Sequence, residues 1–130
     1  MSKKSNPLGD LELQVMEILW KDGGMTVREL WSKEAFGERA YTTMMTTMDR
    51  LYRKGLLCRK SEKKAYLYWP SQKREEYWRT VSQEIMQNLM RLGGASTLTA
   101  FVDAATVDDE ENLELLEALI QKRKRERGDS

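Results

Sequence analysis

Four threonines lie close together near the middle of the sequence, at spacings that place them along the exposed side of a helix. They are Thr42, Thr43, Thr46 and Thr47. The basic residues that follow them within two turns are Arg50, Arg53 and Lys54. Threonine is a mediocre helix former, so this choice adds nothing to helix stability. Its hydroxyl bonds phosphates and base edges, and its methyl group packs against thymine, so the pattern favours a helix that reads the major groove of DNA.

A second basic group follows on a segment where the hydrophobic period changes from about 3.6 to 2. Residues 57–59 and 66–68 alternate in character around a polar tip at 61–64, which predicts a β-hairpin that ends at Pro70. Its basic residues are Arg59, Lys60, Lys63 and Lys64. A basic hairpin straddles a DNA backbone or enters a minor groove, where it adds salt-sensitive affinity and little sequence information.

The charge of the chain is concentrated in these two elements. The whole chain has a net charge of +1, whereas the segment from Arg39 to Lys64 carries eight basic and two acidic residues, a net +6. Such a segment favours a polyanionic partner, although charge alone is as often a solvated face. The threonines that lie between these basic residues are therefore the feature that favours DNA over a solvated surface.

Several functional classes are excluded by what the sequence lacks. It has no histidine and a single cysteine, Cys58, which removes the commonest general base and leaves too few ligands for a zinc site. Neither GxGxxG nor GxxxxGK[ST] is present. We expect no enzyme, no metal and no cofactor. Without a long apolar run or a signal-peptide pattern, we also expect a cytoplasmic protein with no membrane insertion.

The first 70 residues contain three helical patterns, over 10–21, 26–34 and 40–54. Thr26 and Glu29 have the form of a capping box, and Gly55 suits a left-handed helix end. The inward side of the third helix is predicted to be Tyr41, Met44, Met45, Met48, Leu51 and Tyr52. Three helices followed by a basic hairpin predict a winged helix-turn-helix DNA-binding domain over residues 1–70.

Residues 71–130 show only helical signals: a long helix up to Gly93, a short segment over 96–102 and a last helix from about Asp108. We therefore expect a mainly α protein with a small β-hairpin wing. The C-terminal helices have too little of the first domain left to cover their apolar stripes, so a second copy of the chain is the simplest cover. The predicted dimerisation residues are Val81, Ile85, Leu89, Leu113, Leu116, Leu119 and Ile120.

Two blocks of sequence, Leu11–Trp20 and Ala40–Leu56, resemble the penicillinase-repressor family, the BlaI/MecI type with its copper-responsive CopY relatives. The similarity extends weakly through Tyr66–Pro70 and the helices around Gly93 and Gly94. The resemblance implies a homodimeric repressor that binds a palindromic operator. The positions it assigns to DNA contact are Thr42, Thr43, Thr46 and Arg50, with the wing lysines on phosphates.

The resemblance also implies a choice between two switches. Members of the β-lactamase type are inactivated by proteolysis, triggered by a membrane-bound sensor peptidase, within the segment that matches Leu98–Val102. Here Ala100 and Phe101 stand where some members have Asn-Phe, so the aromatic residue is kept and the asparagine is not. The copper-responsive branch carries paired C-terminal CxC motifs, and their absence here excludes copper sensing by that route.

One alternative stays open at this point. A winged helix can also be a protein-interaction module that binds no DNA. The net charge of +6 over Arg39–Lys64 argues against a protein-interaction module, because protein-docking surfaces favour aromatic and apolar anchors over uniform positive charge.

Overall fold

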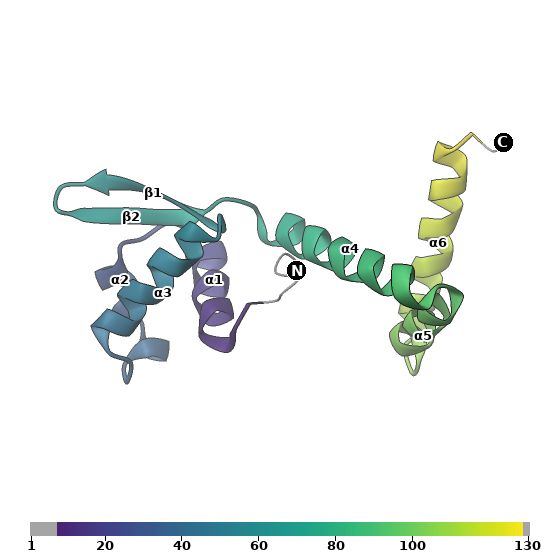
Figure 1. The fold of residues 1–130 in the computed structure, drawn as a ribbon, viewed down its shortest axis with the longest axis horizontal. Coiled ribbons are helices and arrows are strands. Elements are labelled where there is room, and N and C mark those ends of the chain that lie inside the picture. The colour runs from purple at the N-terminus through teal and green to yellow at the C-terminus, as the bar shows by residue number, and fades with distance from the viewer. Residues whose placement is uncertain (1–7, 129–130) are drawn as a thin grey trace. The chain divides into compact units, whose positions relative to one another are not determined.

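The computed structural model describes residues 8–128 and is mostly helical, with one two-stranded antiparallel sheet (Figure 1). The elements in chain order are α1 (Asp10–Asp22), α2 (Val27–Trp31), η2 (Glu34–Phe36), α3 (Tyr41–Arg53), β1 (Leu57–Glu62), β2 (Ala65–Pro70), α4 (Arg74–Gly93), α5 (Ala95–Thr106) and α6 (Glu110–Glu126). The chain divides into two compact units, one up to Glu84 and one from Ile85, so the division falls inside α4.

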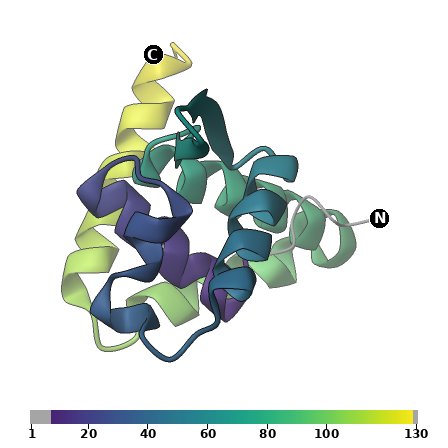
Figure 2. The same cartoon turned by 90° about the vertical axis from the view of Figure 1, so that its left-hand side faces the viewer.

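The core of the first unit is formed by α1, α2, α3 and the hairpin (Figure 2). Its completely buried side chains come from several elements, with Val15 on α1, Leu30 on α2, Phe36 on η2 and Leu51 on α3 all at 0% exposure. Three helices packed together and followed by the hairpin confirm the predicted winged helix-turn-helix arrangement.

The local signals at helix ends are confirmed. The Thr26 amide donates to Glu29 Oε1 at 2.9 Å and the Glu29 amide to Thr26 Oγ1 at 3.1 Å, which completes the capping box at the start of α2. Gly55 has a φ of +86°, the left-handed conformation expected after α3. The predicted extent of α2 to residue 34 was too long, because a turn and η2 follow Trp31 and place Phe36 in the core.

The inward side of α3 differs from the prediction at two residues. Met44, Met48 and Leu51 are fully buried, but Met45 and Tyr52 are 44% and 39% exposed. Successive side chains on a helix are rotated by 100°, so a residue next to Met44 or Leu51 in the sequence points away from the centre of the buried stripe. Met45 and Tyr52, seven residues apart, share one edge of that stripe.

Thr47 was predicted to face outward and is instead buried, at 3% exposure. It lies three residues after Met44 and four before Leu51, inside the buried stripe. Its hydroxyl donates to the carbonyl oxygen of Thr43 at 2.8 Å, so burial leaves no unsatisfied donor. The exposed threonines of α3 are therefore three.

The hairpin is joined to the rest of the first unit at its base. In its antiparallel register Cys58 pairs with Trp69 and Arg59 with Tyr68. Tyr68 also exchanges two backbone hydrogen bonds with Met25, at 2.9 and 3.0 Å. The turn itself is shorter than the predicted polar tip, because β1 continues to Glu62 and β2 begins at Ala65.

The start of α4 packs within the first unit. The Trp20 indole N–H donates to the Gln72 carbonyl oxygen at 2.9 Å, and the ring centroids of Trp20 and Tyr77 are 5.5 Å apart. Arg74 forms two hydrogen bonds with Glu17, at 2.9 and 3.0 Å. The division between a DNA-binding domain up to residue 70 and a dimerisation domain from residue 71 stays a prediction. The contacts of the first unit continue past residue 70 into the start of α4.

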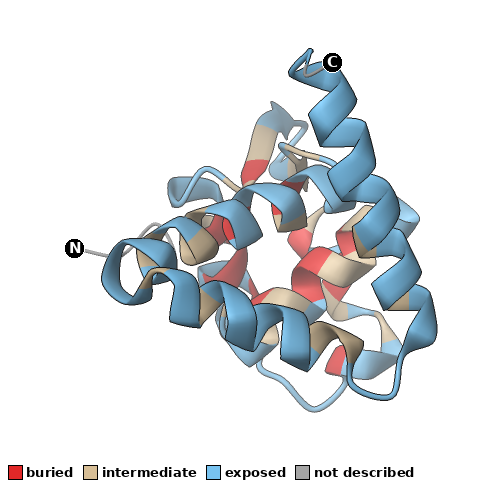
Figure 3. Ribbon diagram, turned by 90° about the vertical axis from the view of Figure 1, so that its right-hand side faces the viewer, coloured by how far each residue is buried: buried red, intermediate tan, exposed pale blue. Residues whose placement is uncertain are grey.

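The second unit contains α5 and α6, and neither helix has a buried residue (Figure 3). α5 runs over twelve residues, longer than the predicted short segment. Asp109 caps α6, with its Oδ1 accepting from the Asn112 amide at 3.0 Å. The Asn112 side chain donates in turn to the Ala105 carbonyl oxygen at 2.7 Å, which ties the two helices together.

Candidate nucleic-acid interface

The exposed face of α3 carries the side chains that could read bases. Thr42, Thr43 and Thr46 are exposed, and none of their hydroxyls donates a hydrogen bond to another of residues 8–128. Arg50 is exposed on the same helix and has no ion pair within the described part of the chain. These four side chains are available for hydrogen bonds to base edges and phosphates.

The N-terminus of α3 also presents backbone donors. The residue at its N-cap is Ala40, which has no side-chain acceptor to satisfy the first amides of the helix. Such amides, together with the helix dipole, favour a phosphate group. The first turn of α3 and its threonines thus suit the same polyanionic ligand.

The wing contributes free positive charge at its end. Lys60, Lys63 and Lys64 are exposed, and no ion pair is found for them among residues 8–128. Lys63 adopts a φ of +59° in the two-residue turn. Short loops and exposed lysines at a hairpin end fit contacts with the DNA backbone.

Lys54 forms an ion pair within the domain. Its Nζ lies 3.0 Å from both carboxylate oxygens of Glu12, which is only 7% exposed. Burial would raise the pKa of Glu12, but hydrogen bonds from the Gly9 amide and from Lys54 outweigh burial and lower that pKa below 4.5. This pair joins the start of α1 to the end of α3.

Arg53 and Arg59 share one carboxylate, that of Asp49. Arg53 Nε lies 2.7 Å from Asp49 Oδ2, and an Arg59 terminal nitrogen lies 3.0 Å from Asp49 Oδ1. The hydrogen bond from Arg53, followed by that from Arg59, lowers the pKa of Asp49. The Arg53 side chain is 73% exposed, whereas that of Arg59 is 18% exposed. The structure therefore places Arg59 beneath the surface on which the other basic residues lie.

The ion-pair roles of Asp49 and Glu12 were not predicted from the sequence. Asp49 and Arg53 are four residues apart on a helix, a spacing that signals an ion pair. Glu12 gave no such signal, because it lies 42 residues from Lys54 along the chain. The net +6 of the segment already counts Asp49, but it leaves out Glu12, whose pairing with Lys54 lowers the positive charge that a ligand would meet.

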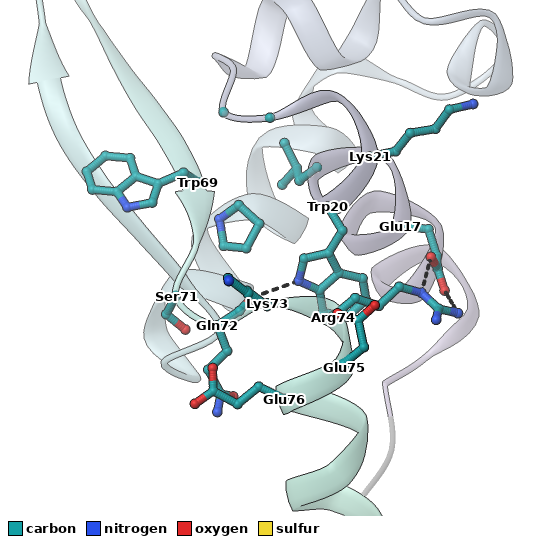
Figure 4. Close-up of a pocket in the computed structure, with 14 residues that line it drawn as sticks. Glu17, Trp20, Lys21, Trp69, Ser71, Gln72, Lys73, Arg74, Glu75 and Glu76 are labelled. Carbon is teal, nitrogen blue, oxygen red and sulfur yellow. Dashed lines mark hydrogen bonds and ion pairs between the residues drawn. The ribbon is translucent and has the colours of Figure 1, made fainter.

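A groove of about 760 Å³ lies elsewhere on the first unit (Figure 4). Trp20 and Trp69 form parts of its walls, and the bonds from Arg74 to Glu17 cross one side. Its charged lining residues are Lys21, Lys73, Arg74, Glu17, Glu75 and Glu76. Equal numbers of cations and anions give this groove no preference for a polyanion.

No group of three or more cysteine, aspartate or glutamate side chains within 8–128 is arranged to hold a metal ion. No helix in the same range has the length and apolar character needed to cross a membrane.

Comparison with known families finds a match over most of the chain. The model of the penicillinase repressor family matches residues 8–122. The transcriptional regulator BlaI of Mycobacterium tuberculosis is 40% identical over 77 residues, which cover 56% of this chain and 54% of the mycobacterial protein. This chain thus matches about half the length of that relative. The penicillinase repressor of Bacillus licheniformis is 25% identical over 127 residues, 96% of this chain and 98% of that protein.

Two solved structures are also similar. The solution structure of the DNA binding domain of the repressor BlaI has a TM-score of 0.48 at 27% identity, and the match covers 54% of this chain and 87% of that one. A MarR family protein from Bacillus stearothermophilus has a TM-score of 0.47 at 20% identity, with 95% and 78% of the two chains covered.

Proposed function

Because this chain belongs to the penicillinase repressor family, we propose that it is a transcriptional repressor that binds double-stranded DNA and has no enzymatic activity. The observation that supports this most directly is the exposed face of α3, where the side chains of Thr42, Thr43, Thr46 and Arg50 make no hydrogen bond or ion pair with residues 8–128. We also propose that it acts in the cytoplasm.

The two elements of the interface would contribute differently. The threonines of α3 are short enough to let the helix lie deep in the major groove and contact base edges, which supplies sequence information. Lys60, Lys63 and Lys64 would bind phosphates, which supplies affinity that falls with salt. Arg53, at 73% side-chain exposure, can add a phosphate contact while it stays near Asp49.

The protein would act as a homodimer on a palindromic operator. Large apolar side chains of the second unit are exposed, including Leu119 at 51% and Ile120 at 53%, although water is a poor environment for them. The proposed contact residues are Ile85, Leu89, Leu113, Leu116, Leu119 and Ile120. Val81, predicted with them, is 7% exposed within the chain and offers little surface to a partner. A two-fold dimer places two α3 helices on two half-sites, which requires a palindrome.

Fluorescence anisotropy on the promoter upstream of the protein's own gene tests the readout. We expect the double variant Thr43→Ala with Thr46→Ala to lose specific affinity by about tenfold or more and to keep weak, salt-sensitive binding. The matched control, Thr80→Ala with Ser82→Ala, removes two exposed hydroxyls from α4 and should bind as wild type does.

Two results would contradict the proposal in different ways. If the wild type and the α3 variant bind promoter and random duplexes equally, α3 does not read the sequence. If the wild type binds no duplex at low salt, the chain is instead a winged-helix protein-interaction module.

We also propose that proteolysis near Ala100 and Phe101, by a membrane-bound sensor peptidase, relieves repression. These two exposed residues lie within α5, so cleavage requires local opening of that helix. α5 buries none of its side chains, which keeps the cost of opening low. Mass spectrometry of the chain recovered from cells with and without a co-expressed sensor peptidase should find a fragment that ends at Ala100 only when the peptidase is present. An intact chain in both samples would contradict this switch.

A further inference from the structure

Arg59 occupies an unusual position for a basic residue of a DNA-binding wing. It lies on β1, directly before the stretch 60–66 in which every residue is exposed. Its own side chain is 18% exposed. Arg59 is therefore the last largely buried side chain of β1 before the end of the hairpin.

The guanidinium group of Arg59 is enclosed by three tyrosine rings. Its Cζ lies 3.9 Å from the ring centroid of Tyr52, 4.1 Å from that of Tyr66 and 5.9 Å from that of Tyr68. Distances below 6 Å over an aromatic face are those of cation–π interactions. The planar guanidinium group suits this stacking, and a lysine ammonium group does not replace it.

These contacts come from different elements of the first unit. Tyr52 belongs to α3, whereas Tyr66 and Tyr68 belong to β2. An Arg59 terminal nitrogen also donates to Asp49 Oδ1 on α3 at 3.0 Å and to the Tyr68 hydroxyl at 3.3 Å. One side chain thus holds the wing against the helix that carries the exposed threonines.

The positive charge of Arg59 is largely compensated by contacts within the domain. Asp49 accepts from it, the tyrosine faces surround it, and little of its surface reaches solvent. A phosphate contact would require the guanidinium group to leave these partners. The lysines beyond it on the hairpin have no such partners among residues 8–128.

We propose that Arg59 is a positioning residue of the DNA interface, which fixes the wing relative to α3 through Asp49 and Tyr52 so that both elements contact one duplex. The inference rests on the proposed function. It differs from a direct phosphate contact in one testable respect: Asp49, an acid, must favour DNA binding, although its negative charge alone would oppose it.

The experiment measures affinity for the promoter duplex by anisotropy at several salt concentrations, with the full-length chain. The variants are Asp49→Ala, Arg59→Lys, the wing pair Lys63→Gln with Lys64→Gln, and the wing pair combined with Arg59→Lys. Arg79→Lys, at an exposed arginine of α4, is the matched control for the arginine change. Circular dichroism and thermal unfolding establish that each variant is folded.

We expect Asp49→Ala and Arg59→Lys each to weaken specific binding by about tenfold, and Arg79→Lys to leave it unchanged. Loss of the two wing lysines should cost about tenfold or more in the wild type and clearly less in the Arg59→Lys background, because a displaced wing has already lost its contacts. Asp49→Ala also releases Arg53 from its ion pair, which by itself would favour DNA binding, so weaker binding by this variant reports the lost Arg59 contact even if Arg59→Lys does not fold.

Two results would overturn the inference alone. In the first, Asp49→Ala binds DNA more tightly than the wild type, as charge removal by itself predicts. In the second, the costs of Arg59→Lys and of the wing pair add without coupling. A wild-type chain that binds no duplex would overturn the proposed function, and this inference with it.

Discussion

The two compact units of this chain differ in how far they bury their apolar side chains. In the unit up to Glu84, α1, α2, α3 and the hairpin place large apolar side chains in a common core, several of them at 0% exposure. In the unit from Ile85, α5 and α6 bury no side chain, and Leu119 and Ile120 are more than half exposed. The first unit has a core of its own, which holds the proposed DNA-binding surface in place. The second leaves large apolar side chains exposed, and these form the surface that the proposed dimer would cover.

The largest expected effect is a loss of folding stability when a core residue of the first unit is truncated. Leu51→Ala removes a side chain at 0% exposure, and we expect the free energy of unfolding to fall by about 2 to 5 kcal/mol. Leu119→Ala, the matched change in the second unit, should alter the stability of a dilute monomer far less. Urea unfolding followed by circular dichroism measures both, and equal losses would contradict the difference between the units.

Truncating exposed apolar residues of the second unit is expected to have a smaller effect, which is to weaken association of the proposed dimer. Leu119→Ala with Ile120→Ala should raise the dimer dissociation constant at least tenfold, about 1.4 kcal/mol, because both side chains are exposed in the single chain. Sedimentation equilibrium gives the constant, and Gln121→Ala on the same helix is the control. A monomeric wild type at high concentration would rule out the proposed dimer surface.

The Glu12–Lys54 ion pair should contribute about 1 kcal/mol to the stability of the first unit, a modest value because the Lys54 side chain is 45% exposed. The pKa of Glu12 is lower in the folded chain than its usual 4.5. Its contribution is therefore present above about 4.5 and is lost as pH falls through the folded-state pKa.

Urea unfolding of Glu12→Gln and wild type across the acid range checks this sign. The variant should be less stable at neutral pH and converge with the wild type in acid. Glu38→Gln, an exposed carboxylate without an ion pair among residues 8–128, is the control. A difference that stays constant with pH would exclude titration of Glu12 as its source.

The smallest effect on stability is expected at the wing. Lys63→Gln should change the unfolding free energy by less than about 0.5 kcal/mol, since the residue is exposed and makes no ion pair with the described residues. It should reduce the slope of log affinity against log salt by about 0.9 for DNA. Lys122→Gln, on α6, should leave that slope unchanged. Equal slopes for Lys63→Gln and the wild type would remove this lysine from the interface.

The sequence by itself determined the order of the three α-helices and the hairpin in the first unit and most of its core, but not η2. Helical and alternating periods are local properties, so Met44, Met48 and Leu51 could be assigned to the buried side, and the capping box at Thr26 and the left-handed Gly55 could be recognised from neighbouring residues. The family match and the exposed threonines of α3 likewise follow from contiguous segments. The helical period alone, however, assigned Met45 and Tyr52 to the buried side and Thr47 to the exposed side, and the structure shows the reverse.

Only the tertiary structure decided which basic residues are available to a ligand. Lys54 meets Glu12 from 42 residues away, and Arg59 meets Asp49 and Tyr52 only because the hairpin folds back on α3. A charge count treats Arg59 and Lys63 alike, yet the first is held among tyrosine rings and the second is exposed at the turn. The physical reason is that ion pairing and burial depend on distances through space, which periodicity and composition along the chain do not encode.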